Sequence, residues 1–282
     1  MQIQTVCVCG AGTMGSGIAQ ITAAADRHTV LYEVQEAVLQ KAKTTIENNL
    51  DVLVQKGKMT HEKRKALLQH IHFTHNIEHC KSDLIIEAIV EKMEAKTALF
   101  HQLAEINSSE SIFASNTSSL SITALAQQIK NPQRVAGLHF FNPAPLMKLV
   151  EVVRGKETGE AVIQTIMAFV QQMNKIPVVC KDAPGFIVNR VARPFYIEAL
   201  RLAEAGITGL ETIDHLLESK GFKLGPFRLM DLIGNDVNYA VSCSVYEQLG
   251  QPERLKPSFI QKEKVELGEL GRKAGKGYYL YS

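Results

Sequence analysis

The chain has 282 residues, and at about 150 residues per domain this length predicts two domains. Its hydrophobic share of 45%, charged share of 21%, 19 glycines and 9 prolines are ordinary for a globular protein, which excludes disordered and collagen-like chains. With 31 basic and 29 acidic side chains the formal net charge is +2, so no general field attracts polyanions and nucleic acid is not expected as a partner.

Strand-like and helix-like segments alternate in the first half of the chain. Short apolar runs predict strands at residues 4–9, 29–32, 71–74, 84–89, 112–114, 135–140 and 149–153. Apolar side chains at helical spacing predict helices at residues 14–25, 36–56, 58–69 and 95–106. This alternation predicts an α/β fold with a Rossmann-type, doubly wound and mostly parallel sheet.

The second half of the chain has a different pattern. Helices are predicted at residues 187–204, 211–219, 231–249 and 257–267, with no convincing strand before the last few residues. Pro194 is expected to kink or break the first of these helices. Because the change follows a turn-rich stretch, we predict a first domain over residues 1–183 and an all-α domain over residues 184–282.

Several features bear on metals and location. Five scattered cysteines argue against a disulfide framework and favour a reducing, cytoplasmic compartment. Cys7 and Cys9 would share one face of a strand as small buried side chains.

Residues 69–80 hold four histidines and a cysteine, but their spacing fits no standard zinc site, so no metal is expected. No targeting segment is visible, and no apolar run reaches 18 residues, so no membrane span is expected.

A glycine motif links the first strand to the first helix. Gly10, Gly12 and Gly15 match G-x-G-x-x-G, with Thr13 and Met14 completing the turn. Gly10 would permit the tight turn, Gly12 the approach of a pyrophosphate and Gly15 close packing of helix on strand. The helix N-terminus would then bind the diphosphate of a dinucleotide.

Glu33 indicates which dinucleotide binds. It lies 23 residues after Gly10, at the end of the second predicted strand, where a carboxylate binds the hydroxyls of the adenosine ribose. A carboxylate there repels a 2′-phosphate, and no arginine follows at once. The cofactor is therefore predicted to be NAD; the alternative is an ordinary solvated glutamate.

Two polar residues interrupt apolar strands. His139 lies within residues 137–143 and Glu151 within residues 148–153. A buried carboxylate is costly unless it is paired, and the simplest partner is the imidazole. Such a pair would fix the tautomer of the histidine and make it a general base. A buried pair with a purely structural role is the alternative.

Two further polar features are candidates for a site. Residues 115–119 place hydroxyls after a strand, at the edge where open α/β sheets bind ligands, although the same hydroxyls can cap the next helix. Asn189 lies in an apolar run, where it either bonds within a helix or faces a cleft.

Several of these segments occur together in one order. Together they resemble the 3-hydroxyacyl-CoA dehydrogenase family, particularly its short bacterial 3-hydroxybutyryl-CoA forms, over residues 10–20, 86–91, 115–119, 137–143, 181–190 and 225–227. The resemblance implies an oxidoreductase that transfers a hydride between NAD and C3 of a short-chain 3-hydroxyacyl-CoA or 3-ketoacyl-CoA. It also implies a place in fatty acid or butanoate metabolism.

The resemblance implies roles for individual residues. His139 matches the catalytic base and Glu151 its carboxylate partner. Ser118 matches the serine that bonds the reacting oxygen and also contacts the cofactor, and Asn189 matches an asparagine near the substrate carbonyl.

Other matches concern the cofactor and coenzyme A. Glu91, Lys96 and Asn142 match positions that line the nicotinamide side of the cleft. Lys56 falls where a family lysine approaches coenzyme A, but Asn49 stands where some members have a CoA-contacting serine. Because family members are typically dimeric, the resemblance also implies a homodimer formed through the helical domain.

Two other functions fit the same fold. One is an L-gulonate dehydrogenase, and the other is a non-catalytic, crystallin-like NAD-binding protein. The basic residues 56–65 favour the CoA ester. The presence together of Ser118, His139, Glu151 and Asn189 argues against a non-catalytic protein.

Overall fold

The computed structural model describes residues 2–281. The chain forms two compact units, of which the first ends at Asp182 and the second begins at Ala183. Among the described residues, no helix is both long and apolar enough to cross a membrane.

The first unit is built on one eight-stranded sheet with the order β3-β2-β1-β4-β5-β6-β7-β8. All neighbouring strands are parallel except the pair β6 and β7. The strands are β1 (Thr5–Cys9), β2 (His28–Tyr32), β3 (Ile71–Thr74), β4 (Leu84–Glu87), β5 (Ile112–Ser115), β6 (Val135–Phe140), β7 (Leu149–Arg154) and β8 (Ile176–Lys181). The mostly parallel Rossmann-type sheet is therefore confirmed, with its ligand-binding switch point between β1 and β4.

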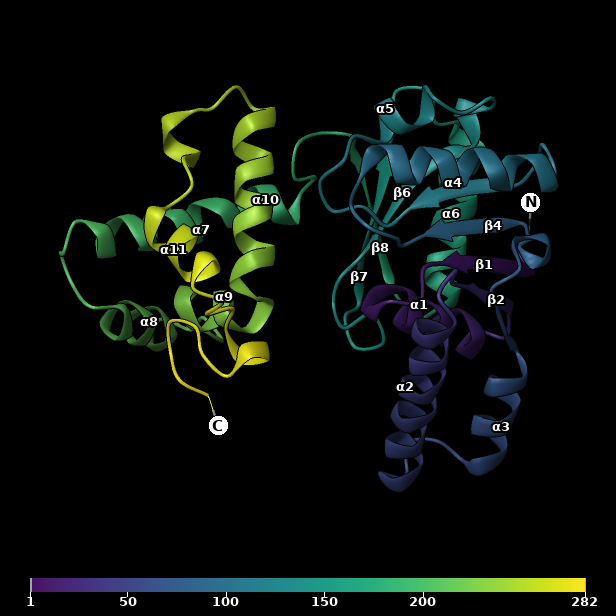
Figure 1. The fold of residues 1–282 in the computed structure, drawn as a ribbon, viewed down its shortest axis with the longest axis horizontal. Coiled ribbons are helices and arrows are strands. Elements are labelled where there is room, and N and C mark those ends of the chain that lie inside the picture. The colour runs from purple at the N-terminus through teal and green to yellow at the C-terminus, as the bar shows by residue number, and fades with distance from the viewer. Residues whose placement is uncertain (1, 282) are drawn as a thin grey trace. The chain divides into compact units, whose positions relative to one another are not determined.

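Helices flank this sheet, and α2 and α3 extend beyond it side by side (Figure 1). The helices of the first unit are α1 (Thr13–Ala24), α2 (Glu36–Gln55), α3 (His61–Gln69), α4 (Met93–Ile106), α5 (Ile122–Ala126) and α6 (Glu160–Gln172). Short 3-10 turns are η1 (Ile77–His79) and η2 (Pro132–Arg134). Helices α5 and α6 and strand β8 were not predicted from the sequence.

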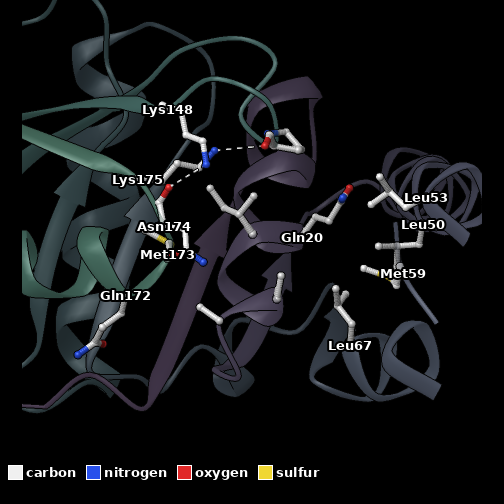
Figure 2. Close-up of a pocket in the computed structure, with 14 residues that line it drawn as sticks. Gln20, Leu50, Leu53, Met59, Leu67, Lys148, Gln172, Met173, Asn174 and Lys175 are labelled. Carbon is white, nitrogen blue, oxygen red and sulfur yellow. Dashed lines mark hydrogen bonds between the residues drawn. The ribbon is translucent and has the colours of Figure 1, made fainter. Parts of the chain in front are cut away.

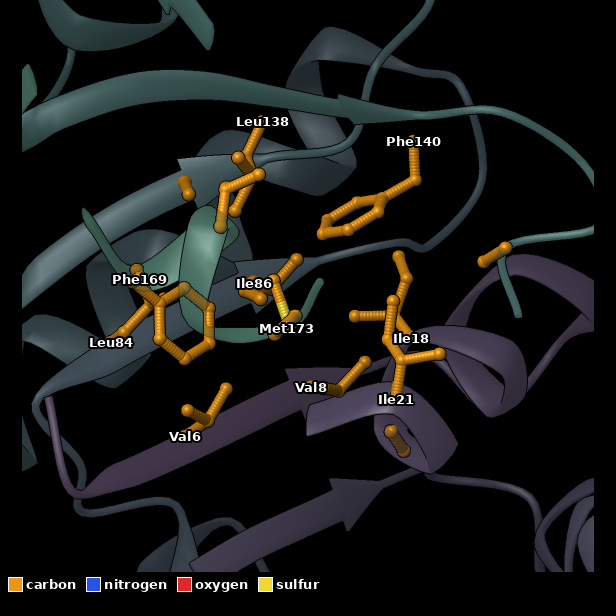
Figure 3. Packing of buried hydrophobic residues seen from close by; sticks show 14 of the residues in the cluster. Val6, Val8, Ile18, Ile21, Leu84, Ile86, Leu138, Phe140, Phe169 and Met173 are labelled. Carbon is orange, nitrogen blue, oxygen red and sulfur yellow. The ribbon is translucent and has the colours of Figure 1, made fainter. Parts of the chain in front are cut away.

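Strands at the centre of the sheet are buried on both faces. Figure 3 shows Val6 and Val8 of β1 beside Ile86 of β4, in one cluster with side chains of α1 and α6. The opposite face of β1 carries the buried thiols of Cys7 and Cys9, whose sulfurs lie 3.6 Å apart. Burial on both faces explains why these strands are continuous apolar runs rather than alternating ones.

The second unit is helical, with no strand in its described part. Its helices are α7 (Val188–Glu204), α8 (Leu210–Ser219), α9 (Pro226–Ile233), α10 (Asn235–Gln248) and α11 (Phe259–Glu266), with 3-10 turns η3 (Glu253–Leu255) and η4 (Arg272–Ala274). The all-α second domain is confirmed.

Two details of the second unit differ from the prediction. The single helix expected at residues 231–249 is divided between α9 and α10 by Gly234, whose φ of +104° is incompatible with a continuous helix. Conversely, Pro194 does not break α7, which continues through it. A proline inside a helix costs roughly 3 kcal/mol, and burial of Tyr196, Ile197 and Leu200 on α7 offsets that cost.

Candidate active site

The glycine turn after β1 is shaped for the close approach of a ligand. Gly10 has a φ of +99°, and a Cβ on it would lie 2.6 Å from the carbonyl oxygen of Ala88, which follows β4. A Cβ on Gly15 would lie 1.7 Å from the carbonyl oxygen of Gly10, so both positions require glycine. No heavy atom lies within 4 Å of a Cβ built on Gly12. The turn is therefore closed toward β4 and α1 but open at Gly12.

Helix α1 begins at this turn without a side-chain cap or an acidic residue in its first turn. Gly12 is the N-cap. Thr13 is exposed and Met14 half-buried. The N-terminal N–H groups and their partial positive charge therefore suit a diphosphate, and the residues present fit NAD.

Glu33 lies beside the same turn. Its Oε2 accepts a hydrogen bond from the backbone N–H of Ala11 at 3.1 Å, and its Oε1 accepts one from Gln35 at 3.1 Å. The half-buried carboxylate is thus fixed next to the turn, where an adenosine ribose is bound in folds of this topology.

His139 and Glu151 face each other across the antiparallel strands β6 and β7, in register. The imidazole Nδ1 lies 2.7 Å from Oε2 of Glu151, and the side chains are 8% and 1% exposed. A carboxylate can only accept hydrogen bonds, so Nδ1 carries the proton and Nε2 is the basic atom of the neutral ring. The structure therefore brings together the pair that the sequence suggested, at the carboxyl end of β6.

The loop after β5 carries Ser118 at the same edge of the sheet. The side chain of Asn116 accepts a hydrogen bond from the backbone N–H of Phe140, the residue after His139, at 2.9 Å. This bond ties the serine loop to the strand that carries the imidazole. Ser118 itself is half-buried, and its backbone N–H donates to Oε1 of Glu91 at 3.0 Å.

Lys96 is buried, and its predicted place on the nicotinamide side of the cleft stays a prediction. Its side chain on α4 is 1% exposed, and its ammonium lies 2.6 Å from Glu87 and 3.1 Å from Glu91. Glu87 was given no role from the sequence, although the signal was present. Glu87 is a carboxylate in an apolar strand, like Glu151, and such a residue needs a buried partner.

Asn142 is exposed in the turn that follows β6. The buried Lys175 holds this turn, because its ammonium donates to the carbonyls of Ala144 at 2.5 Å and Met147 at 2.7 Å. Burial and the nearby Lys148 lower the pKa of Lys175. Lys175 was not singled out from the sequence, although it holds the turn that carries Asn142.

A pocket of about 220 Å³ lies in the first unit, apart from the predicted site residues. Figure 2 shows Leu50, Leu53 and Met59 on one side and Lys148 with Lys175 on the other. None of the predicted site residues lines it.

Lys56 is the exposed C-cap of α2, and the side chain of Asn49 donates to Gln20 at 3.4 Å. The coenzyme A contact of Lys56 stays a prediction.

Asn189 lies on α7 of the second unit, where its side chain is half-buried and its carbonyl accepts from Arg193. Its part in a site also stays a prediction.

The histidines of residues 69–80 form pairs rather than a cluster. The rings of His72 and His79 are hydrogen-bonded at 3.2 Å, and His70 packs on His28 with ring centroids 5.4 Å apart. Within residues 2–281, no group of three histidine, cysteine or acidic side chains has a geometry that could hold a metal.

The sheet order, the glycine turn and the free N-terminus of α1 define a dinucleotide-binding protein of the Rossmann class. Comparison with known proteins gives a narrower result. The family description "3-hydroxyacyl-CoA dehydrogenase, NAD binding domain" matches residues 5–183, and "3-hydroxyacyl-CoA dehydrogenase, C-terminal domain" matches residues 185–281. The chain therefore belongs to the 3-hydroxyacyl-CoA dehydrogenase family, and its first unit is an NAD-binding domain.

Individual relatives agree with this assignment. The chain is 47% identical over 281 residues to the 3-hydroxyadipyl-CoA dehydrogenase of Escherichia coli, covering 99% of this chain but 59% of that protein. It is 39% identical to a probable 3-hydroxybutyryl-CoA dehydrogenase of Deinococcus radiodurans, covering 97% of this chain and 99% of the relative. The crystal structure of (S)-3-hydroxybutyryl-CoA dehydrogenase from Ralstonia eutropha superposes with a TM-score of 0.95 at 37% identity, covering all of both chains.

Proposed function

We propose that the protein is an NAD-dependent 3-hydroxyacyl-CoA dehydrogenase in which His139 and Glu151 act together as the general base. The observation that carries the proposal is their 2.7 Å contact on β6 and β7, within the unit that carries the glycine turn. The names of the relatives support a 3-hydroxyacyl-CoA as the substrate class.

The His139–Glu151 geometry suits proton transfer to and from the oxygen of a carbon that gains or loses hydride. When bound, NAD supplies the hydride acceptor and NADH the donor. In the oxidative direction Nε2 of His139 takes the proton of the C3 hydroxyl, and in the reductive direction it returns that proton to the C3 oxygen. Glu151 keeps the proton on Nδ1 and stabilises the imidazolium that forms.

The remaining predicted residues have binding roles in this proposal. Ser118 donates to the reacting oxygen, Asn189 binds near the substrate carbonyl, and Asn142 contacts the cofactor. Lys56 binds the coenzyme A moiety. Holding the substrate oxygen and C3 in one reactive geometry is worth several orders of magnitude in rate.

Steady-state kinetics with three substrates test the proposed activity. We expect NADH-dependent reduction of acetoacetyl-CoA and of a longer 3-ketoacyl-CoA, and little or no oxidation of L-gulonate with NAD. Faster turnover of L-gulonate would establish the sugar-acid dehydrogenase instead. Tight NADH binding without turnover of any substrate would favour a non-catalytic, crystallin-like protein.

The position of Glu33 predicts a preference for NADH over NADPH. Because its carboxylate would repel a 2′-phosphate, kcat/KM with NADH should exceed that with NADPH by about tenfold or more, which corresponds to about 1.4 kcal/mol. Glu33→Ala should narrow the ratio, whereas Glu62→Ala, which changes an exposed glutamate on α3, should leave it unchanged. An equal or better kcat/KM with NADPH in the parent enzyme would exclude this role.

The second unit predicts a C2 homodimer. Ile197 and Leu200 of α7 are buried inside the unit. Exposed apolar side chains remain on α7 to α11, and they include Val191, Leu232 and Val237. Because such surface on one unit marks an interface, we expect a dimeric mass by light scattering at micromolar concentration. A monomeric mass would contradict this expectation.

We also propose separate roles for the units, with the helical unit serving substrate binding and dimerisation.

All five cysteines lie in the described part of the chain as free thiols. Free thiols suit a reducing compartment, and we propose a cytoplasmic location.

A further inference from the structure

Glu87 is a buried carboxylate with three partners. It is the last residue of β4 and is 0% exposed. Its Oε1 accepts hydrogen bonds from the Lys96 ammonium at 2.6 Å and the backbone N–H of Ile89 at 2.7 Å, and its Oε2 accepts from the hydroxyl of Ser115 at 2.6 Å. A buried carboxylate is tolerated only when such partners compensate its charge, so Glu87 and Lys96 form a buried ion pair.

The Lys96 ammonium is shared between two carboxylates. It lies 3.1 Å from Oε2 of Glu91, in addition to its contact with Glu87. Because the lysine side chain is 1% exposed, its charge is balanced by these two carboxylates rather than by solvent. Glu91, which is 37% exposed, is the partner that faces the solvent side.

Glu91 in turn holds the serine loop. Its Oε1 accepts hydrogen bonds from the backbone N–H groups of Ser118 at 3.0 Å and Ser119 at 3.2 Å, and from the hydroxyl of Thr117 at 2.5 Å. Burial opposes ionisation of Glu91, but the Lys96 ammonium and these hydrogen bonds hold its pKa below the usual range. The carboxylate is therefore kept as an acceptor for the loop that carries Ser118.

We propose that Glu87 is a positioning residue, which fixes the Lys96 ammonium beside Glu91 so that Glu91 anchors the backbone of Ser118. This inference rests on the proposed function, in which the hydroxyl of Ser118 binds the reacting oxygen. Glu87 touches neither substrate nor cofactor, and it acts through Lys96 and Glu91.

The charges of this network predict how its members depend on one another. Glu87 comes from β4, Glu91 from the loop after β4, and Lys96 from α4, while the loop after β5 contributes hydroxyl and N–H groups. Without Lys96, two carboxylates face each other in a largely buried place, and the Coulomb repulsion displaces Glu91. Removing the charge of Glu87 as well relieves that repulsion.

A double-mutant cycle measures this dependence. The variants are Glu87→Gln, Lys96→Met and the double variant, with Glu94→Gln and Lys130→Met as controls because both of those side chains are exposed. For each protein we would measure kcat for acetoacetyl-CoA reduction, the KM for NADH, and Tm at several pH values between about 5.5 and 8. Circular dichroism at the assay temperature establishes that each variant is folded.

The effect of Glu87→Gln on kcat should have opposite signs in the parent and in the Lys96→Met background. Glu87→Gln should lower kcat about tenfold with the KM for NADH within about twofold, because a misplaced positioning group impairs the reactive geometry more than binding. In the Lys96→Met background the same substitution should raise kcat. An equal loss in both backgrounds, or an unchanged kcat after Glu87→Gln in the parent, would contradict the proposal. A purely structural pair would lower Tm and leave the kcat of folded protein unchanged.

Stability gives a readout that does not depend on activity. In Lys96→Met the two carboxyls take up a proton more readily in the folded than in the unfolded chain. The deficit in Tm relative to the parent should therefore grow as pH rises and shrink as pH falls, and the double variant should lack this dependence. A parent enzyme without acetoacetyl-CoA reduction contradicts the proposed function. If Lys96→Met and the double variant instead show equal deficits in Tm that do not depend on pH, the network itself is contradicted.

Discussion

Replacing His139 by alanine is expected to lower kcat for acetoacetyl-CoA reduction by roughly 10²- to 10⁴-fold, the usual contribution of a general acid or base. The imidazole is the group that returns the proton to the C3 oxygen, and its loss leaves only binding and positioning. The KM for NADH should change little, because the glycine turn and Glu33 follow other strands, β1 and β2. His101→Ala, at an exposed position on α4, is the matched control and should retain the parent rate.

The effects of His139 and Glu151 should also be non-additive. If the two side chains form one catalytic unit, adding Glu151→Ala to His139→Ala should lower kcat by much less than Glu151→Ala does in the parent. Fully additive losses would show that the 2.7 Å contact between Nδ1 and Oε2 has no catalytic consequence.

Gly12→Ala is expected to weaken NADH binding without unfolding the protein. The backbone at Gly12 has φ −67° and ψ −171°, an extended conformation that alanine adopts readily, and a Cβ there would meet no protein atom within 4 Å. The added methyl group would instead occupy the side of the turn that a diphosphate approaches. We expect the Kd for NADH to rise by about tenfold or more, or about 1.4 kcal/mol. Titration of NADH fluorescence measures this change.

Gly209→Ala is a matched control for this substitution. Gly209 is the N-cap of α8, with an extended backbone and no atom within 4 Å of a Cβ position, just as Gly12 is the N-cap of α1. Both variants should lose a similar, small amount of stability, roughly 1 kcal/mol or less. Unchanged NADH affinity in Gly12→Ala, or an equal loss in Gly209→Ala, would refute the assignment of the diphosphate to this turn.

Much of the fold was predictable from local patterns. Strands β3 and β6 match the predicted residues 71–74 and 135–140, because short apolar runs are bounded there by polar turns. Strand β8 was missed since it lies at the sheet edge, carries Pro177 and exposes part of its apolar surface, as Ile176 does at 58%. The buried positions of α6 do recur at helical spacing, so that helix carried a readable signal.

The candidate site was predictable where a single residue is unsuited to its neighbours in the sequence, as a charged residue is in an apolar strand. Glu151 in an apolar strand required a partner, and the register of β6 and β7 supplies His139. The partners of Lys96 could not be predicted in the same way. They depend on three elements meeting at one sheet edge, and nothing in the sequence near Lys96 shows that its side chain is buried.

The most direct test of the account is kcat of the Glu151→Gln enzyme, measured together with its Tm and its Kd for NADH on the same preparation. Glutamine keeps the shape of the side chain and removes the charge that stabilises the imidazolium. We expect kcat to fall by at least about tenfold while the protein stays folded and its affinity for NADH stays near that of the parent. A well-folded Glu151→Gln enzyme with the kcat of the parent would remove the His139–Glu151 pair from the mechanism.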